Sequence, residues 1–160
     1  MAVAIVIVSV PFISFGKSLE QVCTDAARHF GINEDEYEMH FTRGKVVTAA
    51  GEEVNGNIVF NEEGRAVYTI RVQKSYSRPF TIAVIFHEFA HAAQHKYRLD
   101  YQGYNAEQHA ELLSFNTMWR SGYWWNAVHL LYMHSWHAKP KDYLVPRELW
   151  NIALTGADFG

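Results

Sequence analysis

The chain has 160 residues, of which 49% are hydrophobic and 19% charged, with a formal net charge of -3. This length suits one compact domain, residues 1–160, and gives little room for a second. The charge provides no basic field for nucleic acid, and the single cysteine, Cys23, cannot form an internal disulfide. We therefore expect a globular protein of a reducing, cytoplasmic setting, with no nucleic-acid or membrane partner.

The N-terminal residues are strongly apolar, and no Lys or Arg precedes them. The missing positive charge and the lack of a clear cleavage site disfavour a signal peptide, and the apolar run is too short to span a membrane. The β-branched residues from Val3 to Val10 instead predict a buried strand. A helix should follow from Ser18, a good cap, to Gly31, and Cys23 would be buried on its apolar face.

Short β-prone runs separated by Gly and Asn turn residues follow the first helix. Tight turns join neighbouring strands as hairpins, so the pattern predicts an antiparallel meander. With the N-terminal strand, we expect an antiparallel or mixed sheet of about four to five strands packed on helices. The predicted strands of the meander are Tyr37–Phe41, Lys45–Ala49, Asn57–Phe60 and Ala66–Gln73.

The next segment, Thr81–Tyr97, predicts a long helix that Ser77 can cap. It contains a His-Glu-x-x-His motif, formed by His87, Glu88 and His91. Residues four apart lie on one face of a helix, so the two imidazoles can converge on a zinc ion. The carboxylate of Glu88 is then placed to hold a water that the ion polarises, which is the role of a general base.

A catalytic zinc site usually has three protein ligands and one open position. His95 is too far along the helix axis to share an ion with the first two histidines, so it should be a helix-end or surface residue. The third ligand should come from the next predicted helix, Asn105–Arg120, where the candidates are Glu107, His109 and Glu111. The two glutamates share one helical face, so one can reach the metal while the other accepts an N–H from a liganding imidazole.

The C-terminal region is rich in aromatic residues and predicts a helix over Tyr123–His137 and a short one from Pro146 to Gly156. Three histidines fall in the first of these helices, at positions 129, 134 and 137. Their spacing does not place them on one face, so we favour a core helix over a second metal site.

The two motifs resemble the gluzincin branch of the zincin metallopeptidases. In many of these enzymes, His-Glu-x-x-His is followed by a helix with Glu-x-x-Ala-Asp or a similar unit, whose first Glu binds zinc. The segment Glu107-Gln-His-Ala-Glu111 has that order, and the resemblance covers Ser77–Phe115. It implies that Glu107 is the ligand and Glu111 supports the site, although the thermolysin-like separation falls on Glu111.

The resemblance implies an α+β, zincin-like fold in which a Glu-bearing helix follows the active-site helix and a helical part ends the chain. It also implies a zinc metallopeptidase that binds one ion and a peptide or protein substrate. Candidate donors to the developing oxyanion are Tyr101, Tyr104, His109 and His134. A catalytically silent zinc-binding regulatory module and a zinc hydrolase of a non-peptide amide remain open alternatives.

Overall fold

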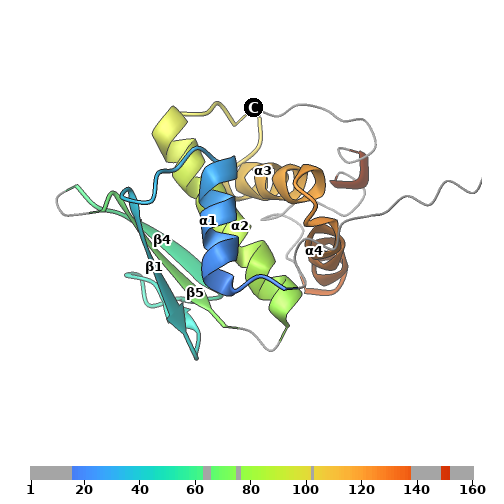
Figure 1. The fold of residues 1–160 in the computed structure, drawn as a ribbon, viewed down its shortest axis with the longest axis horizontal. Coiled ribbons are helices and arrows are strands. Elements are labelled where there is room, and N and C mark those ends of the chain that lie inside the picture. The colour runs from blue at the N-terminus through green and yellow to red at the C-terminus, as the bar shows by residue number, and fades with distance from the viewer. Residues whose placement is uncertain (1–15, 63–65, 75–76, 102, 138–148, 152–160) are drawn as a thin grey trace, which may run out of the picture.

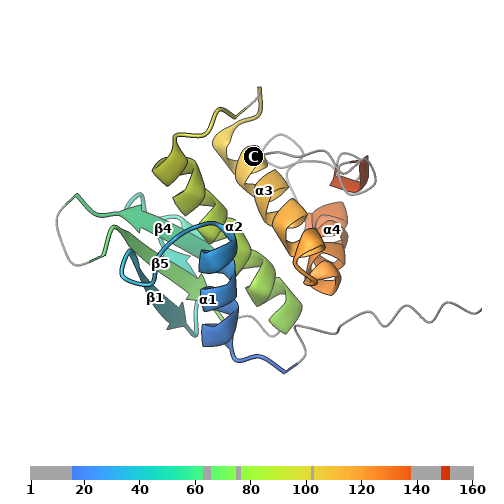
Figure 2. The same ribbon diagram turned by 45° about the horizontal axis from the view of Figure 1, so that its top comes forward.

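The computed structural model describes residues 16–62, 66–74, 77–101, 103–137 and 149–151, with the side chains of 133–137 left aside. It has a mixed α+β architecture in which one helix, α2, is central (Figure 1). This helix contacts strands on one side and helices α1, α3 and α4 around the rest of its surface. Figure 2 shows α3 running beside α2, on the side away from the sheet. The elements are α1 (Leu19–His29), β1 (Tyr37–Thr42), β2 (Val46–Val47), β3 (Glu53–Val54), β4 (Gly56–Phe60), β5 (Tyr68–Gln73), α2 (Arg78–Tyr97), α3 (Ala106–Arg120) and α4 (Trp124–His137).

The helices begin where the sequence supplies caps. Ser18 and Gln21 form a reciprocal capping box at the start of α1, and Asn105 and Gln108 form another at the start of α3. Ser77 caps α2, where its hydroxyl accepts a hydrogen bond from the Phe80 N–H. These contacts satisfy backbone donors that a helix leaves unpaired at its start, so the predicted helices are confirmed with small shifts at their ends.

The strand pairing differs from the predicted meander. The main sheet has the order β1-β5-β4, with β1 parallel and β4 antiparallel to β5, while β2 and β3 form a separate two-stranded sheet. The predicted meander is therefore wrong as a whole, although its last hairpin, between Asn57–Phe60 and Ala66–Gln73, is antiparallel as expected. The described residues form a mixed sheet of three strands and a separate sheet of two strands rather than one larger sheet. Burial gives the physical reason, because β5 buries Tyr68, Ile70 and Val72 and the less buried β1 and β4 take the edges.

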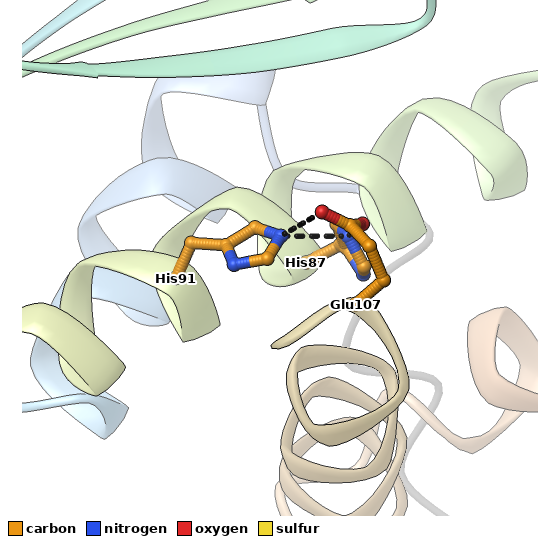
Figure 3. Close-up of side chains that lie close together, drawn as sticks. All are labelled: His87, His91 and Glu107. Carbon is orange, nitrogen blue, oxygen red and sulfur yellow. Dashed lines mark hydrogen bonds and ion pairs between the residues drawn. The ribbon is translucent and has the colours of Figure 1, made fainter. Parts of the chain in front are cut away.

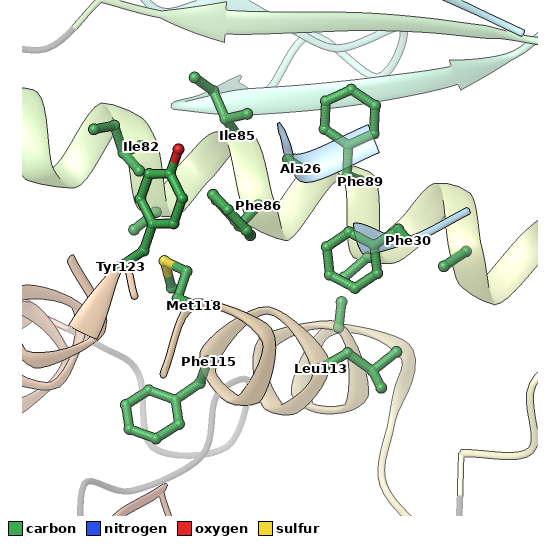
Figure 4. Packing of buried hydrophobic residues seen from close by; sticks show 14 of the residues in the cluster. Ala26, Phe30, Ile82, Ile85, Phe86, Phe89, Leu113, Phe115, Met118 and Tyr123 are labelled. Atoms are coloured by element: carbon green, nitrogen blue, oxygen red, sulfur yellow. The ribbon is translucent and has the colours of Figure 1, made fainter. Parts of the chain in front are cut away.

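The hydrophobic core surrounds α2 (Figure 4). The ring of Phe86 lies 6.4 Å from that of Phe30 in the segment after α1 and 5.0 Å from that of Tyr123 before α4. The ring of Phe89 lies 4.9 Å from that of Tyr37 on β1. Because α2 is packed on both sides, it is a rigid support for the polar residues that it also carries.

Several predictions concern the ends of the chain and the lone cysteine. The predicted strand Val3–Val10 lies outside the described residues, as does most of the predicted helix Pro146–Gly156, of which 149–151 are helical. Cys23 is buried as predicted, and desolvation raises the pKa of its thiol to about 12.

Among the helices of the described residues, none combines the length and the apolar character needed to cross a bilayer.

Candidate metal centre

Helix α2 positions the two histidines of the motif. His87 and His91 are one turn apart, and their rings meet edge to face with centroids 4.7 Å apart. Their Nε2 atoms face each other at 3.1 Å. Both side chains are mostly buried, with 18% and 13% of their surfaces exposed. The prediction that these imidazoles point to one place is confirmed.

Glu107, in the first turn of α3, completes the cluster (Figure 3). One of its carboxylate oxygens lies 3.2 Å from Nε2 of His87, and the other lies 3.4 Å from Nε2 of His91. Potential ligand atoms of the three residues all lie within 4.8 Å of one another. Two nitrogens and a carboxylate therefore converge from two successive helices, a donor set that suits zinc.

The hydrogen bonds of His91 define which atoms of this cluster are acceptors. Its Nδ1 lies 2.8 Å from Oε1 of Gln94, an atom that can only accept, so this ring nitrogen carries a hydrogen. In the neutral ring, Nε2 then presents a lone pair to the Glu107 carboxylate. Two acceptors this close repel each other, and either an N–H on Nε2 of His87, which faces both of them, or a metal ion would relieve the repulsion.

The pKa values of Glu107 and His91 are both shifted in the direction that favours a negative carboxylate beside a positive imidazole. Hydrogen bonds from His87 and His91 hold the pKa of Glu107 far below its usual range. Burial acts to lower the pKa of His91, but its hydrogen bond to Glu107 and the nearby negative charge raise it overall. The Glu107 carboxylate therefore favours the protonated form of the His91 imidazole.

Glu88 lies on the same helix and is only 5% exposed. Desolvation raises the pKa of its carboxyl group against the opposing effect of the nearby imidazoles. The carboxylate packs below β4, where a Cβ added to Gly56 would lie 2.4 Å from Oε1 of Glu88 and 2.5 Å from a methyl group of Val84. Glycine at position 56 thus allows the edge strand to lie directly against the predicted general base.

Gln94 is a site residue that the sequence analysis did not identify. Besides accepting from His91, its amide donates to the Ala106 carbonyl at 2.9 Å and contacts Nδ1 of His109 at 3.0 Å. A polar residue three positions after the second histidine, on the same face of the helix, was the available signal. Gln94 thus makes, on the His91 side, the kind of contact that we expected of Glu111, whose own supporting role stays a prediction.

The other residues predicted for the site lie outside the cluster of His87, His91 and Glu107 or outside the described side chains. Glu111 is buried, at 1% exposed, and lies one turn beyond Glu107, outside the three-residue cluster. His109 is also buried and reaches the cluster through Gln94, while the ring of Tyr101 lies 5.3 Å from that of His109. Tyr104 is half-buried against the core. The side chain of His134, the last proposed oxyanion donor, lies outside the described part of the chain.

Two further histidines on described segments, His95 and His129, have contacts that support the fold. His95 is exposed, as predicted, and stacks on the ring of Phe60 with centroids 4.5 Å apart. Nε2 of His129 lies 2.9 Å from the hydroxyl of Ser77 and so joins α4 to the start of α2.

Comparison with known proteins adds no family assignment, because no family model, curated protein or solved structure gives a significant match to this chain. The functional argument therefore rests on the geometry and chemistry of the cluster.

Proposed function

We propose that this protein is a zinc-dependent hydrolase of peptide bonds, with His87, His91 and Glu107 as zinc ligands and Glu88 as the general base. One observation carries the proposal: a possible ligand atom from each of His87, His91 and Glu107 lies within 4.8 Å of the other two. Two imidazoles and one carboxylate form a ligand set found in catalytic zinc sites, which keep a fourth position open.

The spacing of the ligand atoms supports zinc as the cation. Zinc bonds of about 2.0–2.2 Å at tetrahedral angles place neighbouring ligand atoms about 3.3–3.6 Å apart. The observed separations are 3.1 Å between the two imidazole nitrogens and 3.2 and 3.4 Å from these nitrogens to the carboxylate oxygens. Small side-chain adjustments thus suffice for an ion at the centre of the cluster.

The chemistry of the proposed reaction divides between the ion and Glu88. A bound zinc ion would lower the pKa of a water toward about 7 and polarise a substrate carbonyl. Glu88 would accept the proton of that water and pass it to the leaving amine. Desolvation raises the pKa of Glu88, which makes its carboxylate a better proton acceptor than that of an exposed glutamate.

A zinc-binding module without turnover is the second candidate, and the burial of Glu88 favours it. The carboxylate is 5% exposed and lies below Gly56, so a substrate must gain access beside β4 before hydrolysis can occur. A regulatory zinc site needs no such access.

Replacing Glu88 by Gln tests the proposal, because the amide keeps the size of the side chain and removes the base. Metal analysis should find one zinc ion per chain in both proteins. Digestion of a peptide library should show cleavage by the wild type and a loss of about 100-fold or more in the variant. Cleavage only of a set of non-peptide amides would redirect the proposal to that substrate class.

The controls separate the remaining outcomes. Zinc in both proteins with cleavage in neither would support the regulatory module. A wild-type protein that binds no zinc would contradict both candidate functions. Cleavage that is equal in wild type and Glu88→Gln would remove Glu88 from the mechanism.

A further inference from the structure

Gln94 uses its whole side-chain amide to connect α2 with the beginning of α3. The side chain is 5% exposed. Its oxygen lies 2.8 Å from Nδ1 of His91, and its nitrogen lies 2.9 Å from the Ala106 carbonyl and 3.0 Å from Nδ1 of His109. Ala106 directly precedes Glu107, so one amide contacts a proposed ligand on α2 and the backbone next to a proposed ligand on α3.

The Ala106 carbonyl fixes how this amide is oriented. A carbonyl oxygen accepts only, so the NH2 group of Gln94 must face it and Oε1 must face His91. His91 is therefore protonated on Nδ1 and keeps the lone pair of Nε2 directed at the cluster. The second N–H of Gln94 requires an acceptor on Nδ1 of His109, so neutral His109 carries its hydrogen on Nε2.

We propose that Gln94 is the positioning residue of the metal centre, which aligns His91 and the first turn of α3 through one buried amide. This inference rests on the proposed zinc binding for its functional meaning. The hydrogen-bond pattern that it requires can be measured without metal, so the two can fail separately.

Only an amide of this length satisfies all three partners. Methionine has nearly the same size but removes the acceptor and both donors. Glutamate keeps an acceptor for the Nδ1–H of His91 but places oxygen against the Ala106 carbonyl and against Nδ1 of His109. The two variants therefore divide the role of Gln94 into its contact with His91 and its contacts with α3.

The first test reads the tautomers in the unmodified, metal-free protein. Long-range proton–nitrogen NMR correlations, recorded at a pH raised until the His91 and His109 rings are neutral, distinguish Nδ1–H from Nε2–H forms. We expect Nδ1–H for His91 and Nε2–H for His109. The opposite tautomer at either residue would overturn the assigned hydrogen bonds and the proposal with them.

The second test measures zinc affinity by competition with a chromophoric chelator. Gln94→Met should weaken zinc binding by about 10- to 100-fold, the usual effect of removing a partner of a liganding histidine. Gln94→Glu should bind zinc more tightly than Gln94→Met, because it retains the acceptor for His91. Gln73→Met, which removes a half-buried amide from β5, should bind as the wild type does.

The visible spectrum of the cobalt-loaded proteins adds a readout that a general loss of stability does not change. Gln94→Met should alter the ligand-field bands, whereas Gln73→Met should leave them unchanged. Wild-type zinc affinity and an unchanged cobalt spectrum in folded Gln94→Met would overturn the proposal. If Gln94→Met does not fold, the tautomers of His91 and His109 in the wild-type protein decide whether the proposed role of Gln94 holds. A wild-type protein without zinc affinity would refute the proposed zinc function rather than the hydrogen-bond role of Gln94.

Discussion

Asp25 and Glu107 each lie in a cluster of polar side chains, and the two clusters differ in the hydrogen-bond donors that face the carboxylate. Asp25 on α1 accepts from the ammonium group of Lys17 and from the Tyr123 hydroxyl at 2.6 Å, with the Arg28 guanidinium 3.5 Å away. Around Glu107, by contrast, the partners are two imidazoles whose Nε2 atoms face each other at 3.1 Å. The first carboxylate faces an ammonium group and a hydroxyl that carry hydrogens, whereas the partners of the second can donate or accept according to the tautomer and charge of each imidazole.

The kind of hydrogen-bond donor around a carboxylate thus helps to distinguish a structural ion pair from a candidate metal site. Burial acts to raise the pKa of Asp25, but Lys17 and Tyr123 lower it overall by donating to the carboxylate. An ammonium group and a phenol hydroxyl both present hydrogens to this carboxylate. The hydrogen bond from Tyr123 also joins α1 to the segment before α4. The Glu107 cluster has no such fixed donor among its three members, so its charge state depends on what binds.

The largest expected effect comes from removing the carboxylate of the second cluster. Glu107→Gln should reduce zinc affinity by more than about 100-fold, beyond the range typical of supporting residues, because an amide is a poor zinc ligand. Glu111→Gln is the matched control and should keep one zinc ion per chain. Metal analysis after gel filtration measures both, and the reverse pattern would assign the ligand to Glu111.

A smaller effect is expected in the first cluster. Tyr123→Phe removes the hydrogen bond to Asp25 and should lower the free energy of unfolding by about 1.5–3 kcal/mol, the range for hydrogen bonds to charged groups. Urea denaturation measures this change. Zinc affinity should stay at the wild-type value, and a parallel loss of zinc would contradict the separation of the two clusters.

The smallest effect is the pH dependence of the metal-free protein. The pKa of His91 is raised above 6.5 in the folded state, so its contribution to stability is complete below pH 6.5 and is lost as the pH rises through the folded value. The pKa of Asp25 is lowered from 3.8, so its contribution is present above that pH and is lost only in stronger acid.

Melting temperatures from about pH 5 to pH 9 test this contrast, because the two groups titrate in different ranges. The chelator-treated protein should lose a small part of its stability above pH 6.5, since about half of the Glu107 side chain, 51%, is exposed to solvent. Added zinc should stabilise the protein increasingly over the same range, because its ligands must be deprotonated. Zinc stabilisation that declines with rising pH would contradict the assigned ligands.

The sequence was a good guide to the helices because their signals are local. Ser18, Ser77 and Asn105 each cap the helix that they were predicted to begin. The alternation of Tyr68, Ile70 and Val72 with more exposed residues was also confirmed on β5. Caps and periodic burial depend on residues within one or two turns, so no information about distant contacts is needed.

The sheet order could not be predicted in the same way. Turn residues suggested that each strand pairs with the next, which holds for β2 with β3 and for β4 with β5. The strand β1 instead pairs in parallel with β5, far along the chain, and β2 and β3 stand apart from the main sheet. The partner of a strand depends on competition among all strands for the buried positions against α2. That competition involves contacts between residues far apart in the chain, which short patterns do not specify.

The sequence by itself determined that His87 and His91 share one helical face and that Glu88 adjoins them, because helix periodicity is a local property. It left Glu107 and Glu111 as alternative third ligands and gave no role to Gln94. Only the tertiary structure decided that Glu107 meets both imidazoles and that Gln94 joins His91 to the start of α3. The physical reason is that the packing of the whole core sets the position of α3 along α2. The spacing of residues within one segment does not specify that position.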